Sequence, residues 1–228
     1  MKLRYFAMPA VAVAAVLAFA TTPAQANHSW GNYHWARSGA VQLNIYSSVT
    51  SDWSGNLTTA NSDWNQSQYL QNTVVNSATD TTTRSQCAMP TGAIRVCNYT
   101  YGNTGWSGLA SINTGRGKNR SHITGATTKV NDTYLAGADP AMRQGVMCQE
   151  VGHDFGLDHQ DENFDNPNLG TCMDYTRDWS TNQHPNQHDY DQLASIYSHN
   201  DSSTTTGGLA DHSVIRTGDT VTMITWAQ

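Results

Sequence analysis

Alternating apolar and polar positions predict four β-strands between residues 39 and 131. The alternation runs through residues 39–49, 93–101, 105–112 and 122–131. The turn-forming run Gly102-Asn103-Thr104 joins the second of these strands to the third. Residues 209–228 also end in alternation, at Val221, Met223, Ile224 and Trp226. We expect this tail to form one or two strands that pack back on the domain.

Apolar residues spaced by three and four predict three helices, over residues 57–70, 140–155 and 185–199. The middle helix has the clearest ends. Asp139 is a typical N-cap and is followed by proline at the first helical position. Gly156 can take the left-handed conformation that stops a helix. Strands and helices in this order predict a single α+β domain.

The first 26 residues have the pattern of a secretory signal peptide. A basic start is followed by a short apolar stretch and an Ala-x-Ala end at Ala26. We therefore expect export, a catalytic domain at residues 27–200, a small-residue linker at 201–208 and the tail at 209–228. The apolar run is short and no stop-transfer pattern follows it, which argues against a membrane anchor.

Charge narrows the range of partners. The chain has a formal net charge of −6, and the mature part has −8 because Lys2 and Arg4 are lost with the signal peptide. So few basic residues exclude neither a peptide nor a metal, but they make nucleic acid and anionic membranes poor partners. We expect a monomer that acts on a polypeptide.

Four cysteines remain in an oxidising compartment, which predicts two disulfides among three formal pairings. We favour Cys87–Cys97, which closes a short loop, and Cys148–Cys172. The second pair would tie the middle helix to a later segment.

Residues 149–159 read Gln-Glu-Val-Gly-His-Asp-Phe-Gly-Leu-Asp-His and carry the candidate chemistry. Side chains at positions 149 and 153 point the same way from a helix, so both can grip one ion. Glu150 lies one step along and can reach water activated by that ion. The chain turns at Gly156, and His159 then returns as a third ligand. Three ligands and an open position suit catalytic zinc, with Glu150 as the general base.

The segment resembles the metzincins, zinc endopeptidases marked by HExxHxxGxxH and a later methionine turn. In residues 171–175, Thr-Cys-Met-Asp-Tyr, Met173 matches the turn methionine and Tyr175 matches a tyrosine that assists the oxyanion. The resemblance implies a zincin-like α+β fold, a twisted mixed sheet with an active-site helix and a C-terminal helix. It also implies an edge strand that binds the substrate backbone, here placed at residues 122–131.

Gln149 departs from the metzincin pattern, which has histidine there. An amide oxygen is a weaker zinc donor than imidazole. Three outcomes stay open: Gln149 ligates the metal, another residue replaces it, or the site is inactive. Candidates for the replacement are Asp158, Asp161, His184 and His188.

The sequence therefore predicts a secreted zinc-dependent metalloendopeptidase with Gln149, His153 and His159 at the metal and Glu150 and Tyr175 as catalytic residues. The alternatives are a pseudoenzyme that binds a protein partner through the same cleft, and a module that sequesters zinc. An acidic cluster follows the motif at Asp161, Glu162, Asp165 and Asp174. It suggests either a calcium ion or hydrogen bonds to the ligand histidines.

Overall fold

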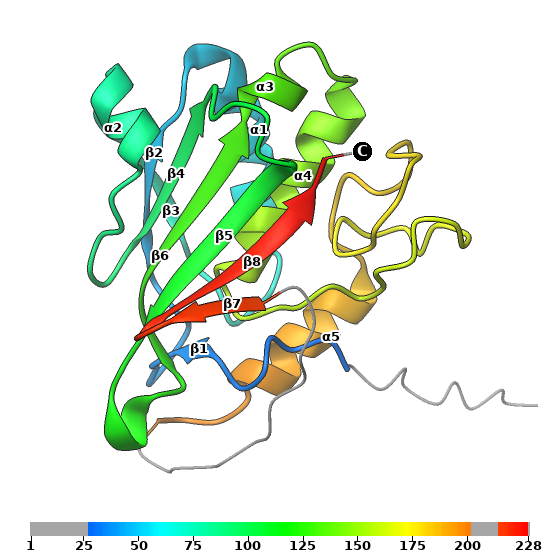
Figure 1. The fold of residues 1–228 in the computed structure, drawn as a ribbon. Helices are drawn as coiled ribbons and strands as arrows, with labels where there is room; N and C mark the ends of the chain where they lie inside the picture. The colour runs from blue at the N-terminus through cyan, green and yellow to red at the C-terminus, as the bar shows by residue number, and fades with distance from the viewer. Residues whose placement is uncertain (1–26, 202–213, 228) are drawn as a thin grey trace, which may run out of the picture.

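The computed structural model describes residues 27–201 and 214–227. The predicted signal peptide, linker residues 202–208 and tail residues 209–213 and 228 lie outside the described residues. In the described part, eight strands form one mixed sheet, with helices packed on it (Figure 1).

The sheet combines a parallel block with an antiparallel one. Its order is β3-β2-β4-β6-β5-β8-β7, and β1 pairs with β6 outside this path. The pairs among β1, β2, β3, β4 and β6 are parallel, and those that β5 makes with β6 and β8, and β8 with β7, are antiparallel. The strands are β1 (His34–Trp35), β2 (Asn44–Ser48), β3 (Thr73–Asn76), β4 (Ile94–Tyr99), β5 (Trp106–Thr114), β6 (His122–Asn131), β7 (Val214–Thr217) and β8 (Thr220–Trp226).

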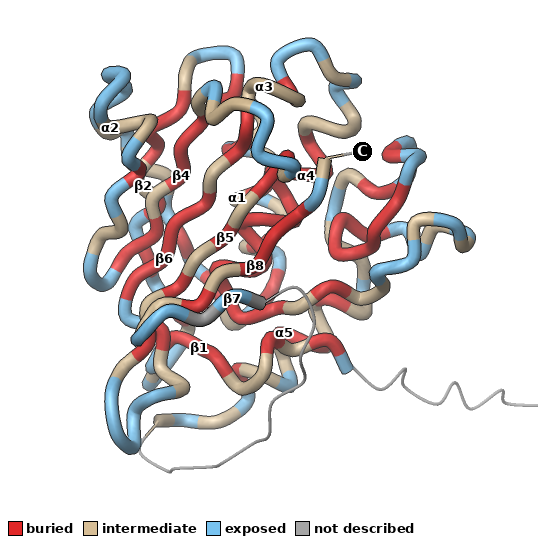
Figure 2. Tube along the Cα trace, in the orientation of Figure 1, coloured by how far each residue is buried: buried red, intermediate tan, exposed pale blue. Residues whose placement is uncertain are grey.

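Two long helices form the layer against the sheet. Helix α4 lies against β5 and β6, and α1 packs against α4. The apolar face of α1 is fully buried and consists of Trp53, Leu57, Ala60 and Trp64. Figure 2 shows the buried residues concentrated between the sheet and these helices. The helices are α1 (Ser51–Trp64), α2 (Thr81–Gln86), α3 (Asp132–Leu135), α4 (Pro140–His153) and α5 (Gln187–Tyr197), with a 3-10 turn at Gly117–Asn119.

The sequence located some elements better than others. β6 has the predicted bounds, and α4 begins at Pro140 behind its Asp139 cap, whose side chain accepts from the Ala141 amide. The helix expected at residues 57–70 instead spans 51–64, because its buried face begins at Trp53. Helix α5 is shorter than the predicted 185–199, since Asn186 caps it. The short elements β1, β3, α2 and α3 were not predicted.

The assignment of residues 122–131 as the substrate-binding edge was wrong. Strand β6 is interior, with β4 paired on one side and β5 on the other. The turn at residues 102–104 does not make β4 and β5 neighbours, because β6 lies between them. The strand next to α4 and beyond β6 is β5, and β8 pairs with its outer side.

Both favoured disulfides are confirmed. Cys87–Cys97 joins the end of α2 to β4, and Cys148–Cys172 joins α4 to the segment before Met173. The Cα atoms of the second pair lie 6.0 Å apart. This bond therefore holds two parts of the predicted motif together.

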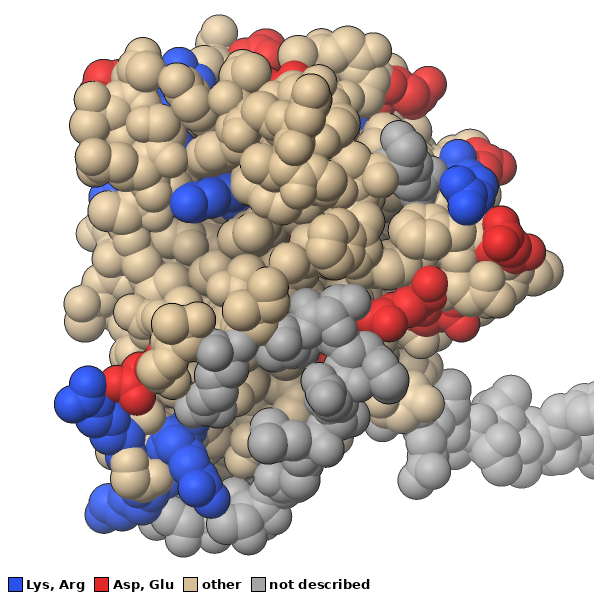
Figure 3. All heavy atoms as spheres, viewed as in Figure 1, with Lys and Arg blue, Asp and Glu red and all other residues tan. Residues whose placement is uncertain are grey.

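Basic residues are confined to small areas of the surface. Arg116, Lys118 and Arg120 are exposed in the loop between β5 and β6, and Figure 3 shows blue atoms gathered at that corner. On this face, the acidic atoms gather on the opposite side of the molecule. Within the described ranges, none of the helices has the length and apolar content needed to cross a bilayer.

Candidate metal centre

Helix α4 brings Gln149, Glu150 and His153 into the interior, where all three are fully buried. The helix can lie this deep because Gly152 has no side chain. A Cβ at Gly152 would lie 2.6 Å from Cζ2 of Trp64 and 2.8 Å from Sδ of Met173. Met173 therefore packs beneath the helix, one residue from His153.

The turn after α4 returns His159 toward His153. Gly156 has a φ of +89°, and a Cβ there would overlap the carbonyl oxygen of Tyr33. Glycine is thus required both by the backbone conformation and by the close N-terminal segment. After this turn, the Nε2 atoms of His153 and His159 lie 3.0 Å apart.

The outer nitrogens of the two histidines have acceptors. His153 Nδ1 donates to the Leu157 carbonyl at 2.9 Å, and His159 Nδ1 lies 3.2 Å from Oε1 of Glu162. Burial lowers the pKa of His153 well below its usual value, so its ring is neutral. With Nδ1 as the donor, Nε2 of each neutral ring carries a lone pair, and the two lone pairs face one another. A divalent cation between them fits this arrangement, and acceptors on the outer nitrogens are typical of metal-bound histidines.

Gln149 lies one helical turn before His153. Its Oε1 accepts a hydrogen bond from Oγ1 of Thr225 in β8 at 2.7 Å. Its Nε2 is buried without a hydrogen-bond partner. A 180° rotation of the amide would let Nε2 donate to the Thr225 hydroxyl and would turn Oε1 to the unpartnered position. Gln149 can thus offer an oxygen to a cation without losing its contact with β8.

Glu150 lies against β5 at Gly108. A Cβ at Gly108 would lie 2.6 Å from Cδ of Glu150, so the carboxylate occupies the space that a side chain would fill. Neither carboxylate oxygen has a hydrogen-bond partner. Burial raises the pKa of Glu150 to about 8, and the Thr225 hydroxyl opposes that shift, although its hydrogen bond is to Gln149. A nearby cation would favour the charged carboxylate.

Tyr175 lies on the other side of His159. The two ring centroids are 4.4 Å apart, and the Tyr175 ring stacks on Phe164. Its hydroxyl donates to the carbonyl oxygen of Ile224 in β8 at 3.0 Å. The side chains of the predicted site therefore meet β8 at two points, Thr225 and Ile224.

The proposed replacements for Gln149 lie elsewhere. Asp158 Oδ1 is 3.9 Å from Nδ1 of His159, the nitrogen remote from His153, and His184 pairs with Asp63 at the surface. His188 stacks on His28 at 4.9 Å. Across residues 27–201 and 214–227, no His, Cys, Asp or Glu offers a ligand atom within 4.8 Å of those of both His153 and His159. Gln149 is thus the remaining candidate among those considered.

The acidic residues after the motif have separate roles. Glu162 is the partner of His159 described above, and Asp174 Oδ2 accepts from the Leu169 amide and the Asn182 side chain. In the described ranges, no three of Asp161, Glu162, Asp165 and Asp174 form a close group of ligand atoms. Their geometry gives calcium no support.

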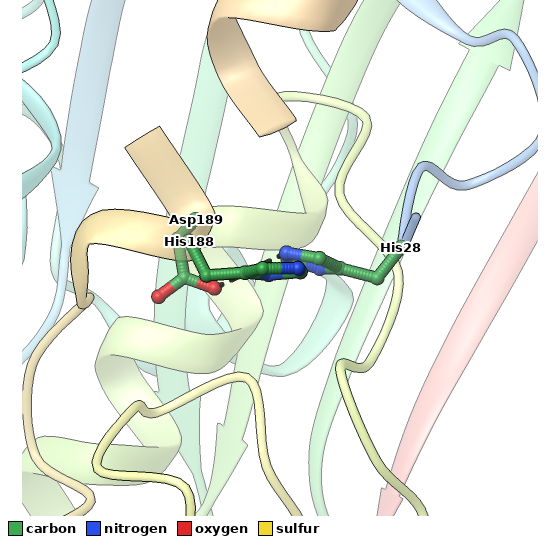
Figure 4. A group of neighbouring side chains, drawn as sticks. All are labelled: His28, His188 and Asp189. Atoms are coloured by element: carbon green, nitrogen blue, oxygen red, sulfur yellow. Dashed lines mark ion pairs between the residues drawn. The ribbon is translucent and has the colours of Figure 1, made fainter. Parts of the chain in front are cut away.

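Two further groups of titratable side chains escaped sequence reasoning. One consists of His28, His188 and Asp189, where Nε2 of His28 lies 3.4 Å from Oδ1 of Asp189. Figure 4 shows its two imidazole rings stacked, with His28 reaching across from the N-terminal segment to α5. The other group consists of His34, His122 and Asp201. Their members are far apart in the sequence, so no local spacing could have revealed them.

No protein-family model matches the chain, and no curated protein matches it. Among solved structures, it is similar to High choriolytic enzyme 1 (HCE-1), a hatching enzyme zinc-protease from Oryzias latipes (Medaka fish). The TM-score is 0.39 and the identity is 12%, over 73% of this chain and 94% of that one. A likeness this weak carries no functional argument, so function has to be inferred from the side chains.

Proposed function

We propose that this chain is a zinc-dependent endopeptidase. The observation that carries the proposal is the pair of buried histidines, His153 and His159, whose Nε2 atoms converge beside an unpartnered carboxylate from the same helix. A core histidine pair without such a function would be expected to satisfy its inner nitrogens with a donor. These two rings satisfy the outer nitrogens instead.

Gln149, His153 and His159 would hold the zinc ion. Bound there, zinc would supply a Lewis acid for attack of water on a peptide carbonyl. Glu150 would take a proton from the attacking water and pass it to the departing amine. Its position against Gly108 fixes the carboxylate beside the histidines and away from bulk water.

Tyr175 would donate a hydrogen bond to the oxygen of the carbonyl under attack. Its hydroxyl already donates to a backbone carbonyl, that of Ile224. A donor aimed at a peptide oxygen is what stabilisation of a developing oxyanion requires.

Export, a monomeric state and the division into signal, catalytic domain, linker and tail belong to the same proposal. The signal-like pattern of residues 1–26 and the two disulfides support export, because disulfides persist in oxidising compartments. The substrate would be a polypeptide, and the scarcity of basic side chains argues against nucleic acid and membranes as partners.

The test uses the mature chain without an affinity tag. We expect about one zinc per site of this kind, hydrolysis of casein and of quenched peptides, and loss of hydrolysis on chelation. Glu150→Gln should retain zinc and lose activity by at least about a thousandfold, because it removes the proton acceptor. Hydrolysis that persists in Glu150→Gln would contradict the proposal.

Gln149→His tests the third ligand. If the amide holds zinc weakly, imidazole should raise both zinc affinity and activity. Tight zinc binding in the unaltered protein with no gain in the variant would show that glutamine serves as well.

The full burial of the site and the contact of β8 with Gln149 favour a second candidate, a protein that holds the fold without catalysis. Metal content separates its two forms. A folded, monodisperse protein purified without zinc would be a pseudoenzyme that binds a protein partner. A zinc-loaded protein that hydrolyses nothing would be a sequestering module.

A further inference from the structure

A second group of histidines converges on Asp201, away from the residues of the candidate metal centre. His34 lies in β1, His122 begins β6, and His199 and Asp201 follow α5. The Nε2 atoms of His34 and His122 both lie 3.0 Å from Oδ1 of Asp201, and that of His199 lies 3.4 Å from the same oxygen. Three imidazoles thus direct the same nitrogen to one carboxylate oxygen.

Hydrogen bonds alone do not satisfy this arrangement. His34 Nδ1 lies 2.7 Å from the Asn32 carbonyl and must donate to it, so Nε2 of the neutral ring faces Asp201 with a lone pair. The same Nε2 lies 3.3 Å from Nε2 of His199. The other oxygen of Asp201, Oδ2, already accepts from the Arg37 amide. A cation at the point of convergence would resolve both unfavourable contacts.

The distances match a tetrahedral zinc site. Zinc bonds of about 2.0–2.1 Å to nitrogen or oxygen place neighbouring ligand atoms roughly 3.3–3.5 Å apart. The four printed separations among these atoms are 3.0, 3.0, 3.4 and 3.3 Å. The His34 ring also stands edge-on to those of His122 and His199, at 79° and 81°. Imidazole donors favour zinc over calcium or magnesium, which prefer oxygen ligands.

We propose that His34, His122, His199 and Asp201 form a second zinc site with a structural role. Four protein ligands leave no open position, as in closed structural sites. The Asn32 carbonyl and the Arg37 amide orient His34 and Asp201 in the way that outer hydrogen bonds orient metal ligands. Bound zinc would tie the N-terminal segment, the start of β6 and the chain after α5 to one point.

The test separates the two sites in the untagged mature chain. The variant His153→Ala/His159→Ala removes the first site and should retain one equivalent of zinc after gel filtration. Adding His122→Ala or Asp201→Asn should weaken that remaining binding by at least about a hundredfold. Adding His184→Ala should not, because that histidine is exposed and pairs with Asp63. Cobalt substituted into the His153→Ala/His159→Ala variant should give the visible absorption of a tetrahedral ion.

Two results would overturn the second site. One is the absence of any retained zinc or tetrahedral cobalt signal in folded His153→Ala/His159→Ala protein. The other is unchanged zinc binding when His122 or Asp201 is replaced. Circular dichroism establishes that each variant is folded, and Asp201→Asn keeps the side-chain volume if His122→Ala does not fold.

Strand β8 lies where an extended substrate would pair with the sheet. It runs antiparallel to β5 from Asn113↔Thr220 to Trp106↔Trp226 (Figure 1). Without β8, β5 would present unpaired backbone groups at the sheet edge beside Glu150, and such edges accept extended peptides. The Thr225 hydroxyl binds Gln149, and the Ile224 carbonyl receives the Tyr175 hydroxyl. β8 thus makes the contacts that the proposed mechanism gives to a substrate.

From this placement we infer that β8 is an internal occupant of the substrate edge, so that the peptidase is latent until β8 leaves β5. The inference rests on the proposed function. The burial of Val221, Met223 and Thr225 closes the strand over α4, and the residues of the site are inaccessible while it stays. Displacement of β8 would expose β5, Gln149 and Glu150 together.

A redox-controlled lock tests this inference in the full mature chain. Ser111 and Thr222 are paired across β5 and β8, with their hydroxyl oxygens 2.8 Å apart, so Ser111→Cys/Thr222→Cys can form a cross-strand disulfide. Mild reduction should release it while the buried native disulfides stay closed. We expect peptide hydrolysis at least tenfold faster in the reduced variant than in the oxidised one, with Ser111→Cys alone unaffected by the reductant.

The outcomes distinguish the latency from the function. Equal hydrolysis in the locked and released states would overturn the inference and leave the peptidase intact. Zinc-loaded protein without hydrolysis in either state would overturn the proposed function, whatever β8 does.

Discussion

At the scale of single residues, Gly108 determines where Glu150 can lie. Alanine at this position should push the carboxylate away from the histidines, because the new Cβ would overlap it. The φ of Gly108 is not positive, so the backbone itself accepts alanine. We expect Gly108→Ala to lower peptidase activity by about a hundredfold or more, by misplacing the general base, with zinc content unchanged.

Steady-state hydrolysis and metal analysis of the same preparation check this prediction. Gly39→Ala is the matched control, since a Cβ there meets nothing within 4 Å. Full activity in Gly108→Ala would mean that Glu150 is not held by β5 in the working enzyme.

His28 and Asp189 form a buried pair with opposite pKa shifts. Burial lowers the pKa of His28 from 6.5 to about 4 and raises that of Asp189 from 3.8 to about 6. The His28 shift disfavours the folded state at low pH, so its contribution to stability rises between about pH 4 and 6.5. The Asp189 shift has the reverse sign, so its contribution falls as pH rises from about 4 to 6. The two effects oppose one another in the intact protein.

Asp189→Asn should therefore reveal the His28 effect. We expect the free energy of unfolding of the variant to rise by on the order of 2 kcal/mol from about pH 4 to 6.5, while the unaltered protein changes less. Asparagine can still accept from the Asn186 amide and from Thr171, as Asp189 does. Denaturant unfolding at several pH values measures the difference, and parallel pH profiles for both proteins would contradict it.

The candidate side chains followed from spacing, but their surroundings did not. Positions 149, 150, 153 and 159 lie within 11 residues, so helical geometry alone brings them together. Thr225 meets Gln149 from 76 residues away, and His34 meets Asp201 from 167 residues away. Such contacts depend on the packing of whole elements, which the local pattern does not contain.

At the scale of elements, the two disulfides have different tasks. Cys148–Cys172 holds α4 to the segment of Met173, whereas Cys87–Cys97 holds α2 to β4. Removing either pair should lower the free energy of unfolding by about 3 kcal/mol, because each closes a loop of the unfolded chain. Only Cys148→Ala/Cys172→Ala should also weaken zinc binding at the first site, by at least about tenfold. Cys87→Ala/Cys97→Ala is the control, and equal zinc affinity in both variants would refute the difference.

Elements with a long, regular pattern were the predictable ones. β6 alternates over ten residues, and α4 has a cap, a proline and a terminal glycine, so both were placed closely. Helix α1 was displaced because tryptophan and tyrosine on both sides of Trp64 extend the apolar spacing beyond the buried face. β1 and α3, at two and four residues, are too short to show a period.

At the scale of the whole molecule, strand order decides which backbone is available to a substrate. Local alternation reports that a strand exists, but not which strands lie beside it. β6 was therefore mistaken for the edge, although it is hydrogen-bonded on both sides. The true neighbour of the site is β5, and its outer side belongs to a segment more than 100 residues later.

The same strand order predicts where the folded protein opens first. β6 is held by β4 and β5 and covered by α4, whereas β8 is held by β5 and by the short β7, with Ile215 and Trp226 exposed. We expect the backbone amides of β8 to exchange with solvent at least about a hundredfold faster than those of β6, through an opening smaller than global unfolding. Hydrogen exchange followed by mass spectrometry over a denaturant series measures both. The oxidised Ser111→Cys/Thr222→Cys variant should slow exchange in β8 and leave β6 unchanged. If β8 and β6 instead shared one rate and one denaturant dependence, β8 would leave only when the whole domain unfolds, and it could not serve as a reversible cover of the site.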